Sequence, residues 1–309
     1  MQQRTLHMLN GDSLTPRLAA INVKDDQLVW REMLCEGKTS YDLRSETFKQ
    51  ERISFLTPFG ADGKTYTESF LNPLLTTNFS KYTSIVLWFE YDLFCHINMI
   101  AALSYLQQSN VSAEIYLVCS GWIENDPNLK GLGELSHKQL ISHYQQKIKL
   151  TTSDIELADR LWRLYCTDNH VTFKNYVTLS SSFPYLSNCI NAHLKRFPSV
   201  TNGLNVLETH ILKIIHKEEI KNTRQLTGYI LQYQGYYGFG DLQIAKIIKK
   251  LADFYELKSK RLSLNRDGLL AIGGLQNSYD KLSDDTVFGN CNKYEYCYHP
   301  EQQILTKHE

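Results

Sequence analysis

The chain has 309 residues, with 33 lysines and arginines balanced by 33 aspartates and glutamates. This length exceeds the roughly 100 to 200 residues of one domain and predicts two. The balanced charge excludes a polycation that coats nucleic acid over its whole surface. The seven cysteines are odd in number and form no CxxC pair, which favours reduced thiols over a disulfide framework or a zinc ribbon.

The N-terminal residues have no apolar core of signal-peptide length, and no later segment approaches the roughly 20 apolar residues of a membrane span. We therefore expect a cytoplasmic protein that does not enter the membrane. Four short apolar runs have the character of buried strands: residues 5–9, 27–30, 85–89 and 114–118. Residues 93–106, between the third and fourth runs, carry apolar side chains at helical spacing. Continuous apolar runs separated by a helix predict a parallel-sheet, Rossmann-like α/β domain over residues 1–135.

Helices are expected to dominate the remaining chain, at residues 136–149, 153–165, 186–196, 207–216, 223–233 and 241–251. Turn-forming residues over 197–203 separate a helical connector, 136–203, from a C-terminal domain, 204–309. In that domain three helices precede a hairpin pattern over 256–272, which is the order of a winged helix. A tyrosine-rich strand pair is expected to follow.

Polar segments follow all four predicted strands. Because the carboxyl ends of parallel strands share one edge of a sheet, ligands bind there, and these segments should converge. The candidate catalytic or binding residues at this edge are Asp12, Ser13, Arg31, Glu32, Glu36, Glu90 and Asp92, with Cys35, Cys95 and His96 as second-tier members. Five of them are carboxylates, which repel one another unless a cation, an arginine or a proton compensates. The sequence therefore favours a functional site at this edge.

The types of residue at this edge indicate their chemistry. Glu90 and Asp92 suit a divalent cation or a general acid and base. Arg31 suits a phosphate or carboxylate, because its fork donates two parallel hydrogen bonds. We therefore predict a small-molecule or nucleotide ligand, and either an enzyme that processes phosphate esters or nucleotides or a protein that only binds the ligand.

Structural explanations stay open for the same residues. Asp12, Ser13 or Asp92 could cap the helix that follows each of them. Arg31 could form an ion pair with Glu32 or Glu90. Cys95 and Cys119 could be small buried apolar residues.

Several sharper motifs fail. Residues 11–14 read Gly-Asp-Ser-Leu, as in GDSL hydrolases, but no histidine in the chain has an aspartate three positions before it. A serine hydrolase is therefore only a lesser alternative. Two Gly-Lys-Thr strings, at 37–39 and 63–65, lack the earlier glycine of a phosphate-binding loop, and no GxGxxG follows the first strand. Cys291, Cys297 and His299 have metal-ligand chemistry, but we expect them to be structural.

Three blocks, residues 10–13, 30–37 and 87–95, resemble the signatures of the uncharacterised bacterial family called domain of unknown function 1835. Residues 193–204, 240–243 and 262–268 resemble the companion C-terminal region of such proteins. The resemblance implies a bacterial cytosolic protein and implies no activity. Tyr91 stands where a histidine is common in the family, which argues against a proton carrier at that position.

The C-terminal domain supplies a competing function. The third helix of a winged helix commonly enters the DNA major groove, and lysines and arginines contact the phosphates. Here the candidate contacts are Lys246, Lys249, Lys250 and Arg261. A solvated helix face explains the same lysines, so nucleic acid is the alternative partner rather than the favoured one.

Overall fold

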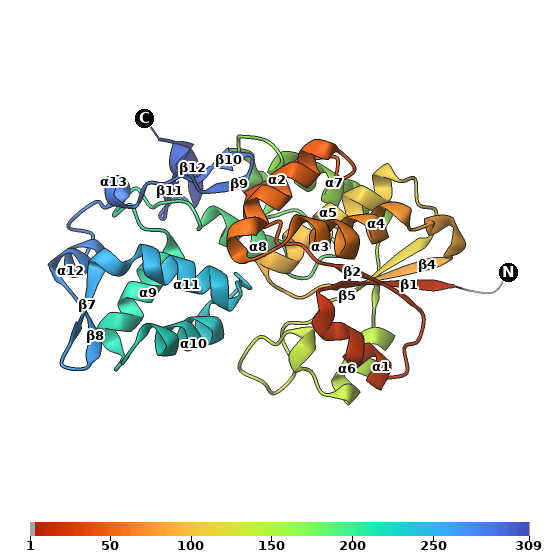
Figure 1. Ribbon diagram of the computed structural model, residues 1–309, viewed down its shortest axis with the longest axis horizontal. Helices are drawn as coiled ribbons and strands as arrows, with labels where there is room; N and C mark the ends of the chain where they lie inside the picture. Colours follow the sequence, from red (N-terminus) through yellow and green to blue (C-terminus); the bar gives the residue numbers. More distant parts are fainter. Residues whose placement is uncertain (1–3, 309) are drawn as a thin grey trace.

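The computed structural model describes residues 4–308, and its centre is a five-stranded sheet in the order β2-β1-β4-β5-β6 (Figure 1). The strands are β1 (Thr5–Asn10), β2 (Asp26–Trp30), β4 (Ser84–Trp88), β5 (Glu114–Val118) and β6 (Ile148–Lys149). The first four are parallel, and β6 runs antiparallel to β5. The predicted α/β class, its four strands and their parallel pairing are confirmed.

Both faces of this sheet are covered, which is why its strands read as continuous apolar runs. Leu6, Met8, Ile85 and Leu87 belong to a large core with helices α5 (Leu93–Gln108) and α7 (Thr152–Tyr165). Intervening residues such as Leu9, Val86 and Trp88 pack on the other face against α1 (Thr15–Ala20) and α6 (His137–Gln145). Figure 1 shows α1 and α6 together on that side of the sheet.

The helix predicted over residues 136–149 is wrong at its C-terminal end. Ser136 accepts a hydrogen bond from Gln139 N and begins α6, but α6 ends at Gln145. The chain then turns, and Ile148 pairs with Leu117 of β5 as the edge strand of the sheet. Pairing within this sheet thus continues beyond residue 136, into a segment where a helix was expected. The other predicted helices are present: α7, α8 (Leu186–Leu194), α9 (Val206–Lys217), α10 (Thr223–Tyr233) and α11 (Asp241–Lys250).

A hairpin follows α11, as predicted, but it is shorter than expected. Strands β7 (Tyr255–Lys258) and β8 (Arg261–Leu264) are antiparallel, and Ser259 and Lys260 between them both have positive φ. The second part of the expected hairpin is instead helix α12 (Arg266–Ile272), which Asn265 caps by accepting a hydrogen bond from Gly268 N. The helix order and the hairpin fit the predicted pattern, and the winged-helix assignment itself stays a prediction.

The last segments of the chain pair with each other and with an early one. After α13 (Tyr279–Leu282), β9 (Val287–Gly289) pairs with β10 (Cys291–Asn292) and, in parallel, with β3 (Gly37–Lys38). The expected tyrosine-rich pair is present as β11 (Tyr296–His299) and β12 (Ile304–Lys307). Within residues 4–308, Cys291, Cys297 and His299 do not gather into a metal-binding group.

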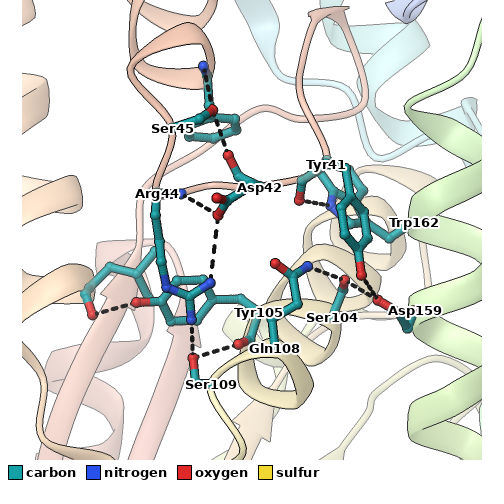
Figure 2. Close-up of polar contacts among 12 residues, drawn as sticks. Tyr41, Asp42, Arg44, Ser45, Ser104, Tyr105, Gln108, Ser109, Asp159 and Trp162 are labelled. Atoms are coloured by element: carbon teal, nitrogen blue, oxygen red, sulfur yellow. Dashed lines mark hydrogen bonds and ion pairs between the residues drawn. The ribbon is translucent and has the colours of Figure 1, made fainter.

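The segment between β3 and β4 is helical: α2 (Glu46–Leu56), α3 (Gly63–Tyr66), a π-helical turn over Thr67–Leu71, and α4 (Asn72–Thr76). A polar cluster fixes the turn that leads into α2 (Figure 2). Tyr41 Oη and Ser104 Oγ both donate to Asp159 Oδ1, at 2.7 and 2.6 Å, and Trp162 Nε1 donates to the Tyr41 carbonyl at 3.0 Å. These contacts tie the start of α2 to α5 and α7.

Candidate functional site

The carboxyl ends of the parallel strands are joined by one buried side chain. Asn98 of α5 donates from Nδ2 to Asn10 Oδ1, at the end of β1, and to the Glu32 carbonyl, just after β2. Its Oδ1 accepts from Leu34 N at 3.1 Å. Asn10 Nδ2 in turn lies 3.0 Å from Cys95 Sγ. The polar segments after β1, β2 and β4 therefore do converge, as the parallel sheet predicts.

A cavity of about 650 Å³ opens beside this edge. One wall is formed by the residues that follow β2, including Arg31 and Glu32, and another by α2 and α3. The third wall is the start of α11 and the glycine-rich loop before it. The lining includes Arg31, Leu56, Phe59, Gly238 and Leu242 from these walls, and Phe94 from the start of α5. The helix predicted to read DNA therefore contributes its first turn to this cavity.

Arg31 is the cation of the cavity wall, and its partner is Asp12. Arg31 Nε and Nη2 donate to the Asp12 carboxylate at 2.9 and 2.6 Å, and Nη1 donates to the Ser69 carbonyl. The two side chains are 36% and 64% exposed, so water screens the pair. Asp12 does not cap the 3-10 turn Asp12–Leu14, because Gly11 holds the cap position without a side-chain bond. Ser13 is exposed in that turn.

Glu32 is a structural carboxylate rather than a reactive one. Arg52 of α2 donates to both of its oxygens, at 2.9 and 2.8 Å, and both side chains are fully buried. Tyr66 Oη and Met33 N also donate hydrogen bonds to the Glu32 carboxylate, at 2.7 and 2.6 Å. Arg31 therefore forms its ion pair with Asp12 and not with Glu32 or Glu90. The partner of Glu32 is Arg52, which was not among the predicted site residues.

Glu36 and Cys35 lie away from the cavity. Glu36 lines two neighbouring hollows on the side of β3 and β9, so the seven predicted residues do not share one cleft. Cys35 is fully buried, and burial raises the pKa of its thiol, which makes it an apolar residue at neutral pH rather than a nucleophile.

Glu90 and Asp92 form the chemically distinctive part of the edge. Donor atoms of Glu90, Asp92 and Cys95 all lie within 4.8 Å of one another, the one such His, Cys, Asp or Glu group in the part of the chain that the structure describes. Burial, with the neighbouring Asp92 charge, raises the pKa of Glu90 to about 7. Burial raises the pKa of Asp92 to about 6 and also raises that of the Cys95 thiol. The carboxylates are thus poised to exchange a proton near neutral pH.

Asp92 also has the structural role that was left open for it. Its Oδ1 accepts from Cys95 N at 2.8 Å and caps α5. Glu90 Oε1 accepts from Gly133 N at 3.3 Å. His96 is buried behind the pair: its Nδ1 contacts the Asp92 carbonyl, and burial lowers its pKa to about 4. His96 is therefore neutral and not placed to act as a base on a ligand in the cavity.

A loop that sequence analysis missed separates the carboxylates from the cavity. Leu93 N and Phe94 N, at the start of α5, donate to the Tyr236 and Tyr237 carbonyls at 2.8 and 3.2 Å. The side chain of Gln234 closes the loop by bonding both backbone groups of Phe239. Gly238 in this loop lines the cavity and also packs on Asp92. The glycines of the string Gln-Gly-Tyr-Tyr-Gly-Phe were the available sequence signal.

Gly238→Ala should destabilise the protein more than Gly235→Ala. Both glycines have a φ of 68°, where a Cβ costs about 1–2 kcal/mol. A Cβ at Gly238 would also lie 2.1 Å from Asp92 Cγ. A Cβ at Gly235 would have no neighbouring atom of the described residues within 4 Å. Urea denaturation of both variants measures the difference. Equal losses would show that the loop does not press on Asp92.

One of the four residues proposed to contact nucleic acid, Lys250, is held in an ion pair within the protein, and Lys246 lies near an aromatic ring. Lys250 Nζ binds Asp284 Oδ2 at 2.5 Å and Tyr294 Oη at 2.8 Å, and Lys246 Nζ lies 5.6 Å from the centre of the Phe59 ring. Lys246, Lys249 and Arg261 are exposed. A duplex would therefore have to compete with internal contacts along one side of α11.

No protein-family model matches the chain, and no curated protein matches it either. The resemblance to the family described above therefore stays a prediction. None of the helices within residues 4–308 has the length and apolar character needed to cross a membrane.

Proposed function

We propose that this protein binds a small phosphate-bearing ligand, of the nucleotide or phosphate-ester class, at the carboxyl edge of its parallel sheet and processes it with Glu90 and Asp92. The observation that carries the proposal is the close group of half-buried Glu90 with buried Asp92 and Cys95, beside a cavity large enough for such a ligand. Buried carboxylates with raised pKa values are costly to the fold, and such groups concentrate at active sites.

Each part of the site has a distinct task in this proposal. With a pKa of about 7, Glu90 can release or accept a proton at neutral pH, which suits a general acid or base. The same oxygens would hold a divalent cation, which would supply charge stabilisation to a phosphate. Arg31 would bind the phosphate, because its exposed pair with Asp12 is weak enough for a ligand to displace.

The C-terminal unit contributes a wall of this site in the proposal. Its first α11 turn and the loop at Gly238 would have to shift for a ligand in the cavity to reach Asp92. We favour this role over nucleic-acid binding because Lys250 is already paired with Asp284. A winged-helix arrangement of residues 204–275 is compatible with either role.

The test is a thermal-shift and calorimetric screen of the full chain against nucleotides and sugar phosphates, each with and without Mg²⁺ or Mn²⁺. A ligand at 100 times its Kd should stabilise the fold by about 2.7 kcal/mol. Glu90→Gln and Asp92→Asn should keep the fold and lose the metal response and any turnover, and Arg31→Gln should weaken ligand binding. Glu124→Gln, an exposed carboxylate that lines neither the cavity nor the two neighbouring hollows, is the control.

The proposal fails if no member of the screen raises the melting temperature. It also fails if Glu90→Gln and Asp92→Asn retain the metal response and turnover of the unmodified chain. In that case the pair would serve only to cap α5 and to hold the loop at Gly133.

A further inference from the structure

A second, smaller hollow lies on the other side of Gln243 from the main cavity, and Gln243 lines both. Its volume is about 60 Å³. One water needs roughly 10–15 Å³ of such space, so the hollow has room for several waters or one small ion. Arg196, Tyr237 and Lys246 line it, and they come from the end of α8, the glycine-rich loop and α11.

Arg196 is buried without a countercharge. Its side chain is 3% exposed and its guanidinium lies 3.8 Å from the centre of the Phe288 ring. Nη1 donates to the Cys35 carbonyl and Nη2 to His193 Nδ1. Nε makes no regular hydrogen bond within the described chain, and the Tyr165 hydroxyl, which also lacks a partner, lies close to the guanidinium. No carboxylate of residues 4–308 forms an ion pair with it.

The two histidines behind Arg196 are neutral and add no charge to the site. His170 Nε2 lies 3.0 Å from the Tyr165 carbonyl, which can only accept, so this nitrogen carries the proton. His170 Nδ1 then accepts from His193 Nε2 at 2.9 Å, and His193 Nδ1 accepts from Arg196. Both imidazoles are neutral, and burial lowers the pKa of His170 to about 3 and that of His193 well below its usual value.

Tyr237 places a second unpartnered group at the same hollow. Its side chain is 7% exposed, and Oη has no hydrogen-bond partner among the described residues. Burial raises its pKa, so the hydroxyl keeps its proton and can donate. Buried polar groups without partners are rare and call for a ligand, an ion or water that completes them.

The remaining charges leave the hollow positive. It is lined by four cations and three carboxylates, namely Arg196, Lys246, Lys250, Lys293, Glu36, Glu208 and Asp284. Lys293 binds Glu208 at 2.8 Å and Lys250 binds Asp284, so these four charges cancel in pairs. Arg196 and Lys246 then face Glu36 alone, an excess of one positive charge.

We propose that this hollow is a binding site for a small oxyanion, a phosphate, held by Arg196, Tyr237 and Lys246. A phosphate oxygen accepts from the hydroxyl and from both cations, which satisfies Tyr237 Oη and balances the buried guanidinium. The phosphate could be the free ion or the end of a phosphate monoester. The site is separate from Glu90 and Asp92, so it does not depend on the catalytic role proposed for them.

The experiment measures the melting temperature of the full chain against inorganic phosphate and against adenosine monophosphate, with sodium chloride at equal ionic strength as reference. We expect a saturable rise with phosphate. Tyr237→Phe, which removes only the hydroxyl, and Lys246→Gln should each weaken binding about tenfold, the value of one charge-assisted hydrogen bond. Lys249→Gln, an exposed lysine of the same helix, should leave binding unchanged.

The outcomes separate the possible explanations. Tyr237→Phe should be as stable as the unmodified chain without phosphate, because it removes an unpartnered group; a merely structural hydroxyl would cost stability instead. Tighter binding of the monophosphate than of phosphate, lost in the same two variants, would identify an ester as the ligand. The proposal is overturned if phosphate has no saturable effect, or if Arg31→Gln abolishes the effect while Tyr237→Phe and Lys246→Gln do not. That last result would leave the proposed function intact.

Discussion

Arg52→Met is expected to lower the free energy of unfolding by about 3–5 kcal/mol, the cost of breaking a buried ion pair from one side. Arg52 is fully buried and donates to both oxygens of Glu32 and to the carbonyls of Met33, Glu36 and Lys38. Its loss would leave a buried carboxylate without a cation and would take one donor from each of three carbonyls. Urea denaturation monitored by tryptophan fluorescence measures the change.

The double variant Glu32→Gln with Arg52→Met is the control for this prediction. Removing both charges should recover part of the loss, because a buried pair mainly harms the fold when one member is left alone. A loss below about 1 kcal/mol in Arg52→Met would contradict the structural role assigned to the pair. It would reopen Glu32 as a member of the reactive site.

Glu90→Gln should become progressively more stable than the unmodified chain as the pH rises from 4.5 to 8. The folded protein holds the Glu90 proton up to a pKa of about 7, whereas the unfolded chain releases it near 4.5. Protonation therefore stabilises the fold fully below pH 4.5, and this contribution is lost as the pH passes 7. At about 1.4 kcal/mol per pKa unit, the difference should grow by about 2–3 kcal/mol.

Stability must be compared at each pH, because buried histidines act in the opposite direction. The lowered pKa values of His96 and His170, about 4 and 3, mean that the fold loses stability as the pH falls below 6.5. Both histidines are present in Glu90→Gln and in the unmodified chain, so their contributions cancel when the stabilities of the two proteins are subtracted at the same pH. Asp92→Asn, which can still cap α5, should show a similar trend. A difference that does not change with pH would argue against buried, interacting carboxylates.

The sheet was predictable because its strands are buried on both faces. Residues 85–89, for example, are all apolar, which is typical of a strand that is buried on both faces. The helical spacing of residues 93–106 predicts a crossover helix between the third and fourth strands. The short strands were not predictable in this way. Gly37–Lys38 and Ile148–Lys149 owe their conformation to the partner strand that they meet, and two residues carry no period of their own.

The candidate site was predictable in place but less so in roles. The strand ends identified Asp12, Arg31, Glu90 and Asp92 as candidates, because topology alone brings the ends of parallel strands to one edge. Glu32 could not be distinguished from the others, since its arginine lies on a helix that shows no strong apolar stripe. The loop at Gly238 was missed because only tertiary packing brings it onto Asp92.

The pairing of Gly37–Lys38 with Val287–Gly289 has a consequence for biosynthesis. During translation, β3 stays unpaired until residues 39–286 and then β9 have been synthesised. The N-terminal half therefore cannot complete its native strand pairing before that point. An unpaired strand edge is a template for association with other chains. We expect nascent chains arrested before residue 287 to be clients of chaperones and proteases, and release of the completed chain to be the step that makes the protein resistant to them.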